Sequence, residues 1–415
     1  MKTPTSLRLH IAIVGRTNVG KSSFLNLITM QDVSITSPLK GTTTDVVYKT
    51  MELLPIGPVV FIDTAGIDDD SSLSELRIKK SLKVFDKCDV MILVVEPDIW
   101  TDYESMMIEE SKKRNIPYII VVNKIDIKFP SEVFIEKVKN VTDRIILVSS
   151  ITDSREEKEK FINDLKKELL NVLPDDYVKP PALISDLVPA SGFVIFIVPI
   201  DLQAPKGRLI LPQVQAIRDI LDGDAMCAIV KEREYPYLLE KLGFLPDLVV
   251  CDSQVVLKMV ADTPSNVKCT TFSILFSRYK GDLLEMVKGV FAIDKLRDGD
   301  KILIAESCSH HPIEDDIGRI KIPRWLRQYT GLNVSFDVYS GFDFPENIKE
   351  YKLIIHCGAC MINRKLMLSR IENAKAAGVP ITNYGVCISY LQGVLKRVLT
   401  PFPLALNLYE EMTNG

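Results

Sequence analysis

Short apolar runs recur along the whole chain and alternate with longer amphipathic stretches. Runs of this kind, bounded by turn residues, are typical of strands that are buried on both faces of a sheet. We expect strands at 9–14, 46–54, 58–62, 90–95, 118–122, 192–200, 225–231, 248–251, 270–276, 301–305, 334–339, 353–355 and 379–383. The second and third of these are expected to form a hairpin, and the later strands to form largely parallel sheets.

Helical periodicity separates many of these runs, and a group of prolines interrupts the pattern once. We expect helices around 154–170, 214–221, 238–242, 254–260 and 366–376. Four prolines break the pattern between 174 and 190, which predicts a linker there. The chain should therefore be an α/β protein in which a domain at 1–173 is followed by two further α/β domains, at 191–280 and 281–415.

Composition and charge narrow the range of partners. The chain has 415 residues and a formal net charge of −4, so no basic field would attract nucleic acid or an anionic membrane. The start of the chain lacks the apolar region of a signal peptide, and the longest apolar runs are too short to span a bilayer. Eight irregularly spaced cysteines do not suggest a secreted disulfide scaffold. We expect a cytoplasmic protein with reduced thiols that binds neither membrane nor nucleic acid.

A phosphate-binding motif, GxxxxGK(S/T), follows the first expected strand and precedes a helical stretch. Its glycines let backbone N–H groups turn toward the phosphates at a helix N-terminus. Lys21 would reach the β- and γ-phosphates, and the Ser22 hydroxyl would bind Mg²⁺. The residues expected to contact the nucleotide here are Gly15, Asn18, Val19, Gly20, Lys21, Ser22 and Ser23.

Two further motifs arrive in the order that GTP hydrolysis requires. By resemblance to related GTPases, Thr43 would close on Mg²⁺ and the γ-phosphate. Asp63 ends an expected strand and would hold Mg²⁺ through water, with the Gly66 N–H near the γ-phosphate. We therefore assign Lys21, Thr43, Asp63 and Gly66 to hydrolysis.

The base is predicted to be guanine. The motif Asn123-Lys124-Ile125-Asp126 follows the strand at 118–122, and the Asp126 carboxylate can accept hydrogen bonds from N1–H and the 2-amino group of guanine. Adenine offers neither donor, so ATP would leave a buried acceptor unpaired. Ser149 and Ser150 occupy the position of the last guanine-contacting loop. These ordered motifs predict a GTPase.

Two positions depart from Ras-type GTPases. Ile67 stands where Ras has its water-orienting glutamine, which predicts slow intrinsic hydrolysis. Asn18 stands where TrmE-like GTPases use an asparagine to bind K⁺, which predicts hydrolysis stimulated by K⁺. The alternative for Asn18 is an amide that only stabilises the loop.

Cysteine and histidine gather in the last third of the chain. Three of the four histidines lie within three residues of a cysteine there: His310 and His311 beside Cys308, and His356 beside Cys357. Each cysteine follows an expected strand, and parallel strands would bring both to the crevice at their carboxyl ends. The loop that begins at Asn383 follows its own strand and is a further candidate to line this crevice.

Three thiols, from Cys308, Cys357 and Cys360, suit a soft metal or an iron–sulfur cluster. A zinc site that adds His310 is an alternative, and ligand types alone do not separate the two. A 4Fe–4S cluster would have one weaker ligand, for which Glu306, His310 and His356 are candidates, as they are for hydrogen-bonding neighbours of the ligands. The histidines could also do no more than hydrogen-bond the backbone. The remaining thiols are expected to be packing residues, with Cys387, at the start of the final helix, kept as a minor ligand candidate.

The pattern CxH…HCxxC, together with the GTPase motifs, resembles the HydF family of FeFe-hydrogenase maturation GTPases. The resemblance implies a GTP-binding, a dimer-forming and a cluster-binding domain, in which Cys308, Cys357 and Cys360 hold a 4Fe–4S cluster with an exchangeable fourth site. Such a protein is a homodimer or larger assembly that uses GTP and Mg²⁺. It carries the diiron precursor of the H-cluster, made with the radical-SAM maturases HydE and HydG, to the FeFe-hydrogenase apoprotein.

Two other classes of protein remain open at this stage. One is a zinc-containing regulatory GTPase that binds RNA or ribosomes. The other is a redox enzyme that uses Cys357 and Cys360 as a dithiol.

Overall fold

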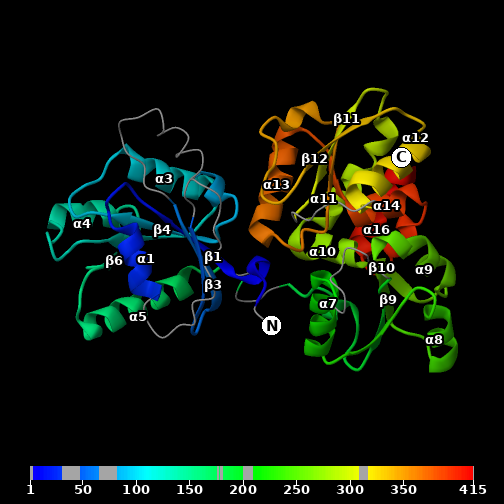
Figure 1. Cartoon of the computed structure of the whole chain (residues 1–415), viewed down its shortest axis with the longest axis horizontal. Coiled ribbons are helices and arrows are strands. Elements are labelled where there is room, and N and C mark those ends of the chain that lie inside the picture. The colour runs from blue at the N-terminus through cyan, green and yellow to red at the C-terminus, as the bar shows by residue number, and fades with distance from the viewer. Residues whose placement is uncertain are drawn as a thin grey trace. The chain divides into compact units, whose positions relative to one another are not determined.

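The computed structural model describes residues 3–29, 47–64, 82–174, 177, 181–199, 209–307 and 316–414. The chain divides into two compact units, Met1–Pro180 and Pro181–Gly415 (Figure 1). Each unit is built on mainly parallel sheets, so the predicted fold class is confirmed.

The first unit has a six-stranded sheet in the order β2-β3-β1-β4-β5-β6. Every neighbouring pair is parallel except the β2–β3 hairpin. Its strands are β1 (Leu9–Val14), β2 (Val47–Leu53), β3 (Gly57–Asp63), β4 (Val90–Val95), β5 (Tyr118–Val122) and β6 (Ile145–Leu147). Its helices are α1 (Lys21–Thr29), α3 (Asp102–Lys113), α4 (Glu132–Lys139) and α5 (Arg155–Val172).

Helices cover both faces of this sheet. Apolar residues of α1 and α5 pack on one face, and those of α3 and α4 pack on the other. The central strands β1 and β4 are buried at every position. A strand with both faces covered is an uninterrupted apolar run rather than an alternating one, which is why these two strands are readable from the sequence.

The second unit contains two four-stranded sheets, and all their strands are parallel. The first sheet, in the order β10-β9-β7-β8, consists of β7 (Phe193–Ile197), β8 (Met226–Val230), β9 (Leu248–Cys251) and β10 (Lys268–Thr271). The second, in the order β12-β11-β13-β14, consists of β11 (Lys301–Ala305), β12 (Ser335–Tyr339), β13 (Leu353–His356) and β14 (Ile381–Asn383).

The helices of this unit are α7 (Leu211–Asp222), α8 (Tyr235–Leu242), α9 (Val256–Asp262), α10 (Phe272–Lys280), α11 (Leu283–Val290), α12 (Ile322–Thr330), α13 (Arg364–Ala377), α14 (Tyr384–Leu391), α15 (Leu395–Val398) and α16 (Pro403–Asn414). A π-helical turn, Ile317–Lys321, leads into α12. Single 3₁₀ turns lie at Thr5–Leu7, Ser185–Leu187, Ser253–Val255, Ile293–Lys295 and Ile348–Glu350.

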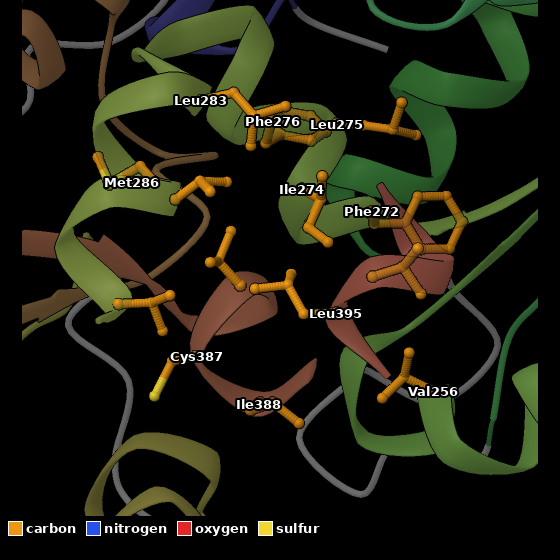
Figure 2. Packing of buried hydrophobic residues seen from close by; sticks show 14 of the residues in the cluster. Val256, Phe272, Ile274, Leu275, Phe276, Leu283, Met286, Cys387, Ile388 and Leu395 are labelled. Carbon is orange, nitrogen blue, oxygen red and sulfur yellow. The ribbon is translucent and has the colours of Figure 1, made fainter. Parts of the chain in front are cut away.

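One apolar core joins the two sheets of the second unit. It extends from Leu183 to Ala405 and takes in residues of both sheets. Figure 1 shows α10 between the sheets, and Figure 2 shows its side chains packed with those of α11, α14 and α15. Cys387 of α14 is fully buried in this core, where burial raises the pKa of its thiol to about 12. Its place in the core is that of a packing residue.

Two details differ from the sequence-based expectations. The apolar run at 270–276 was predicted as a strand, but β10 ends at Thr271 and α10 begins at Phe272. Thr271 Oγ1 accepts a hydrogen bond from the Ile274 N–H (3.2 Å), which caps the helix. A short run that is buried on all sides has no periodicity to separate helix from strand. In addition, α14 is not the final helix, because α15 and α16 follow it.

No helix among the described residues is both long enough and apolar enough to cross a membrane.

Gly289 of α11 provides a test of the packing between α11 and β14. A Cβ atom at this position would lie 1.9 Å from the carbonyl oxygen of Ile381. We expect Gly289→Ala to lower the free energy of unfolding of the second unit by about 3 kcal/mol, because overpacking costs more than the higher helix propensity of alanine gains. Urea unfolding followed by Trp325 fluorescence, in a Trp100→Phe background, would report on this unit alone. Lys288→Ala, at the exposed neighbouring position, should leave the transition unchanged, and an equal effect of both substitutions would contradict this packing.

Candidate functional site

The phosphate-binding loop connects β1 to α1, and two of its glycines are required by close contacts. A Cβ atom on Gly15 would lie 2.5 Å from the Val94 carbonyl oxygen. At Gly20, where φ is +92°, a Cβ would lie 2.3 Å from Asn123 Nδ2. Asn18 has φ +63°, a left-handed conformation that asparagine tolerates better than most residues. The loop is therefore held closely against β4 and the loop after β5.

Lys21, the first residue of α1, places its ammonium inside the phosphate-binding loop. Its Nζ donates hydrogen bonds to the carbonyl oxygens of Gly15 (2.9 Å) and Arg16 (2.7 Å). The side chain is buried, so its charge is little screened by solvent. This is the position from which a lysine can exchange carbonyl acceptors for phosphate oxygens.

Ser22 and Asp63 meet at the predicted Mg²⁺ site. Ser22 lies at the start of α1 and Asp63 at the end of β3, which pairs with β1. The Ser22 hydroxyl donates to Asp63 Oδ2 (3.3 Å). Burial raises the pKa of Asp63 above its ordinary value, whereas the Lys21 ammonium and the Ser22 hydrogen bond act in the opposite direction. The structure brings these two predicted residues together, whereas Thr43, Gly66 and Ile67 lie outside the described residues.

Asn123 connects the phosphate-binding loop to the last loop of the nucleotide site. Its Nδ2 donates to the Val19 carbonyl oxygen (2.9 Å). Its Oδ1 accepts from the Ser150 N–H (3.1 Å) and hydroxyl (2.8 Å). Asp126 of the same motif is exposed. Asn123 therefore braces the site, and the role of Asp126 in reading the base stays a prediction.

A chain of charged side chains, which the sequence did not indicate, joins the phosphate-binding loop to the base-reading loop. Arg16 Nε donates to Oε1 of the fully buried Glu104 (2.8 Å). Arg16 Nη2 also lies 3.8 Å from Glu96 Oε2, and Glu96 pairs with Lys124. Glu104 caps α3 together with Thr101, and this capping box is the part of the arrangement visible in the sequence. The contact with Arg16 spans 88 residues and leaves no local signal.

The two cysteine-bearing loops of the second unit follow neighbouring parallel strands. Strands β11 and β13 pair with Ala305 opposite His356, so both loops leave the same edge of the sheet. Ser307 N–H donates to Cys357 Sγ (3.1 Å), and the Cys357 thiol donates to Ser307 Oγ (3.2 Å). The predicted adjacency of the two strands is confirmed. Cys308, His310 and His311 lie outside the described residues.

Cys357 and Cys360 belong to a tight loop after β13. Ala359, between them, has φ +56°. Burial raises the pKa of the Cys360 thiol to about 11, with a further contribution from Cys357, while the Lys280 ammonium opposes the shift. Within the described ranges, no group of three or more His, Cys, Asp or Glu side chains is arranged to hold a metal ion. The described residues thus supply two thiols of the predicted three.

Both ring nitrogens of His356 are hydrogen-bonded. Nδ1 lies 2.8 Å from the Cys357 carbonyl oxygen, so it carries the proton. Nε2 lies 2.9 Å from Arg370 Nη1 and accepts from it. Burial and the Arg370 charge lower the pKa of His356 to about 3, so the ring is neutral. In this conformation His356 orients the loop by hydrogen bonds, which is one of the two roles left open by the sequence.

Glu306, between β11 and Ser307, is also buried and already bonded. Its Oε2 accepts hydrogen bonds from Arg319 Nη2 (3.1 Å) and the Ser340 hydroxyl (3.0 Å). On the other side of β13, strand β14 pairs His356 with Asn383. Asn383 caps α14, which begins at Tyr384, so a helix N-terminus rather than a loop lies at the same edge of the sheet as the cysteine loops.

Comparison with known proteins finds matches over most of the chain. Three protein-family models match: 50S ribosome-binding GTPase over residues 10–124, hydrogen maturase F dimerization domain over 183–281, and hydrogen maturase F tetramerization domain over 284–401. GTPase Era of Thermoanaerobacter sp. (strain X514) is 30% identical over 254 residues, which cover 56% of this chain and 80% of Era. The tRNA modification GTPase MnmE of Mesoplasma florum is 38% identical over 146 residues, 35% of this chain and 31% of MnmE. A crystal structure of Aquifex aeolicus Era bound to GDP and AlF4⁻ is 21% identical, with a TM-score of 0.33, over 56% of this chain and 98% of that one.

The first unit is thus a P-loop GTPase domain related to Era and MnmE, which binds GTP with Mg²⁺ and hydrolyses it. The two models specific to hydrogen maturase F follow it and together match more than half of the chain. The chain belongs to the hydrogen maturase F (HydF) family, as its cysteine and GTPase motifs predicted. It is a hydrogenase maturation GTPase whose dimerization and tetramerization domains support oligomer formation.

Gly20 allows a test of the close contact between the phosphate-binding loop and Asn123. We expect Gly20→Ala to weaken GDP binding by about tenfold or more, because the new methyl group displaces Asn123 and with it both nucleotide loops. Titration with a fluorescent GDP analogue would measure the change. Lys139→Ala on the exposed end of α4 should bind GDP like the unchanged protein. Full affinity in Gly20→Ala would show that Asn123 is not fixed in place.

Proposed function

We propose that the chain is a GTP-hydrolysing scaffold and carrier that binds a 4Fe–4S cluster through Cys308, Cys357 and Cys360. The contact that supports this is the hydrogen bond from the Ser307 N–H to Cys357 Sγ (3.1 Å). Ser307 immediately precedes Cys308, and consecutive Cα atoms are about 3.8 Å apart. Cys308 is therefore one peptide bond away from Ser307, whose N–H contacts Cys357, the first cysteine of the CxxC pair.

The chemistry of the described residues suits a thiolate-bound cluster. Thiolate sulfurs are the usual ligands of iron–sulfur clusters, and hydrogen bonds to them stabilise their negative charge. The Ser307 N–H donates to Cys357, and the N–H groups of Cys360 and Met361 act in the same way on Cys360. When bound, the cluster would supply one iron that is not held by thiolate and can be bridged by the incoming diiron cargo.

The fourth ligand is proposed to be weakly held and not a thiolate. Of its three candidates, Glu306 is bonded to Arg319 and Ser340, and His356 uses both ring nitrogens. Recruiting either one would require existing buried hydrogen bonds to break. His310 lies outside the described residues, so all three stay candidates.

The GTPase site is proposed to hydrolyse GTP slowly and to be stimulated by K⁺. Lys21 would balance charge on the β- and γ-phosphates, while Ser22 and Asp63 hold Mg²⁺. Asn18 would offer its amide oxygen to K⁺, which supplies positive charge near the reacting phosphate. Thr43 and Gly66 would complete the site around the γ-phosphate, and GTP turnover would modulate contacts with partners.

The open edge of the first sheet in the second unit is proposed to form the dimer. Strand β8 is at that edge, where its backbone groups can pair with another strand, and Met226 and Ile229 on it are exposed. We further propose a division of the chain into a GTP-binding part at 1–173, a linker at 174–190, a dimerization part at 191–280 and a cluster-binding part at 281–415. The partners would be HydE, HydG and the FeFe-hydrogenase apoprotein, all met in the cytoplasm.

Metal analysis separates this function from its rivals. Protein purified anaerobically should be brown and contain about four iron and four sulfide per chain. Cys308→Ser, Cys357→Ser and Cys360→Ser should each lose the cluster and the ability to activate hydrogenase, whereas Cys88→Ser in the first unit should keep both. Colourless protein that contains only zinc would favour a regulatory GTPase that binds RNA or ribosomes. Full activity of Cys308→Ser would favour a dithiol redox enzyme.

The potassium site can be tested through the rate of GTP hydrolysis. We expect the rate in K⁺ to exceed that in Na⁺ by about tenfold or more, because an added cation stabilises charge that develops in the transition state. Asn18→Gly should remove the difference, since glycine accepts the left-handed conformation but offers no amide oxygen. Equal rates in Na⁺ and K⁺ for the unchanged protein would refute the site.

A further inference from the structure

Lys280, the last residue of α10, has a buried ammonium group that contacts the CxxC loop. The residue is 1% exposed and is among the largest fully buried side chains of the described chain. Its Nζ donates to the carbonyl oxygens of Ala359 (3.2 Å), Cys360 (3.0 Å) and Ile362 (2.7 Å). All three acceptors belong to the loop that carries the paired cysteines or to the residues directly after it.

Such a burial is costly unless something compensates the charge. Removing an ammonium from water is costly, and carbonyl dipoles offset only part of this cost. The ring of Phe276 lies 5.8 Å from Nζ and contributes a weak cation–π contact. An apolar side chain of similar length would fill the same space but would leave the three carbonyl oxygens without this donor. A neutral donor such as an amide could bind carbonyl oxygens without burying a charge. The charge itself is therefore better explained by what lies beside it.

The loop that receives these bonds carries the two thiols. The Lys280 ammonium lies 3.0 Å from the carbonyl oxygen of Cys360 itself. Metal binding by cysteine requires the thiolate. A buried positive charge beside the loop stabilises that negative charge, because little solvent screens it.

Helix α10 also contacts the loop at its other end. Ser273, in the first turn of α10, lies beside Gly358, where an added Cβ would be 3.8 Å from Ser273 Oγ. The same hydroxyl oxygen lies 3.0 Å from both Asn383 Nδ2 and the Gly385 N–H, which donate to it. The first turn of the helix therefore lies close to Gly358, and its last residue bonds the carbonyls of Ala359, Cys360 and Ile362.

We propose that Lys280 is a positioning residue for the cluster site, which fixes the CxxC loop through three carbonyls and places a positive charge beside the loop that carries the thiolates. This role presupposes the cluster site proposed above. It makes α10, the last helix of the segment matched by the dimerization model, a structural part of metal binding by the segment that follows. Because this loop would bind metal through thiolates, its affinity for any thiophilic metal should depend on Lys280.

Three substitutions in the full-length protein separate the shape of the loop from its charge. Lys280→Met removes both the charge and the donors, Lys280→Gln keeps a donor without charge, and Lys280→Arg keeps both. Lys288→Met on the exposed face of α11 is the matched control. The probes are Co²⁺, followed by its thiolate charge-transfer absorption, and the iron and sulfide content after anaerobic reconstitution.

We expect Co²⁺ affinity to fall about tenfold or more in Lys280→Met, as is typical when a residue that orients metal ligands is lost. Lys280→Gln should be intermediate, and Lys280→Arg and Lys288→Met should stay close to the unchanged protein. Iron and sulfide content should follow the same order. In metal-free protein, backbone amides of 357–363 should exchange with deuterium faster in Lys280→Met and not in Lys288→Met.

The outcomes distinguish the two proposals. If the unchanged protein acquires no iron and sulfide, the cluster function fails, while Co²⁺ affinity and amide exchange still decide the role of Lys280. If the unchanged protein acquires the cluster and Lys280→Met matches it in affinity and exchange, the positioning role is overturned. Should Lys280→Met not fold, equal Co²⁺ affinity in the Gln and Arg variants would overturn the charge contribution, and weaker binding by Gln would support it.

Discussion

The hydrogen bond between the Ser307 N–H and Cys357 Sγ depends on the register of two parallel strands. Because Ala305 lies opposite His356, strands β11 and β13 end at the same edge of the sheet and in register with each other. A shift of one residue would turn Cys357 to the other face and separate it from Ser307. The register is in turn held by strands buried on both faces, so the whole core of the second unit contributes to aligning one sulfur with one amide.

Pairing of parallel strands also brings site residues together in the first unit. Strands β1 and β3 are neighbours, and this brings Ser22 and Asp63 together although 41 residues separate them. Loops after parallel strands then need bracing, because they lack a ladder of their own. Asn123 provides it in the GTPase unit and His356 in the second, and each uses both polar ends of its side chain to tie two segments together.

The sequence predicted those parts of the molecule that have a local signature. The bounds of β1, β4, β5, β9 and β11 were predicted without error, because these strands are continuous apolar runs between polar turns. The GTPase motifs were readable for the same reason: their spacing along the chain is fixed by a single loop. The run at 270–276 was misassigned because nothing local distinguishes a buried helix from a buried strand.

The remaining features arise from contacts between distant segments. Arg16 meets Glu104 across 88 positions, and Lys280 meets the cysteine loop across about 80. Neither lysine nor arginine shows in the sequence whether it is solvated or buried. The tautomer of His356 is likewise fixed by Arg370 of α13, through a contact that exists only in the folded chain.

The continuous apolar core of residues 183–405 limits how this part of the chain can be divided, both in expression and in evolution. The two segments that match separate domain models pack their apolar side chains into one core. Cutting the chain near residue 282 would therefore expose apolar surface on both segments. They should be inherited, expressed and unfolded as one body. A displacement at the edge strand β8 would then be transmitted toward the thiols through the packed side chains of this core.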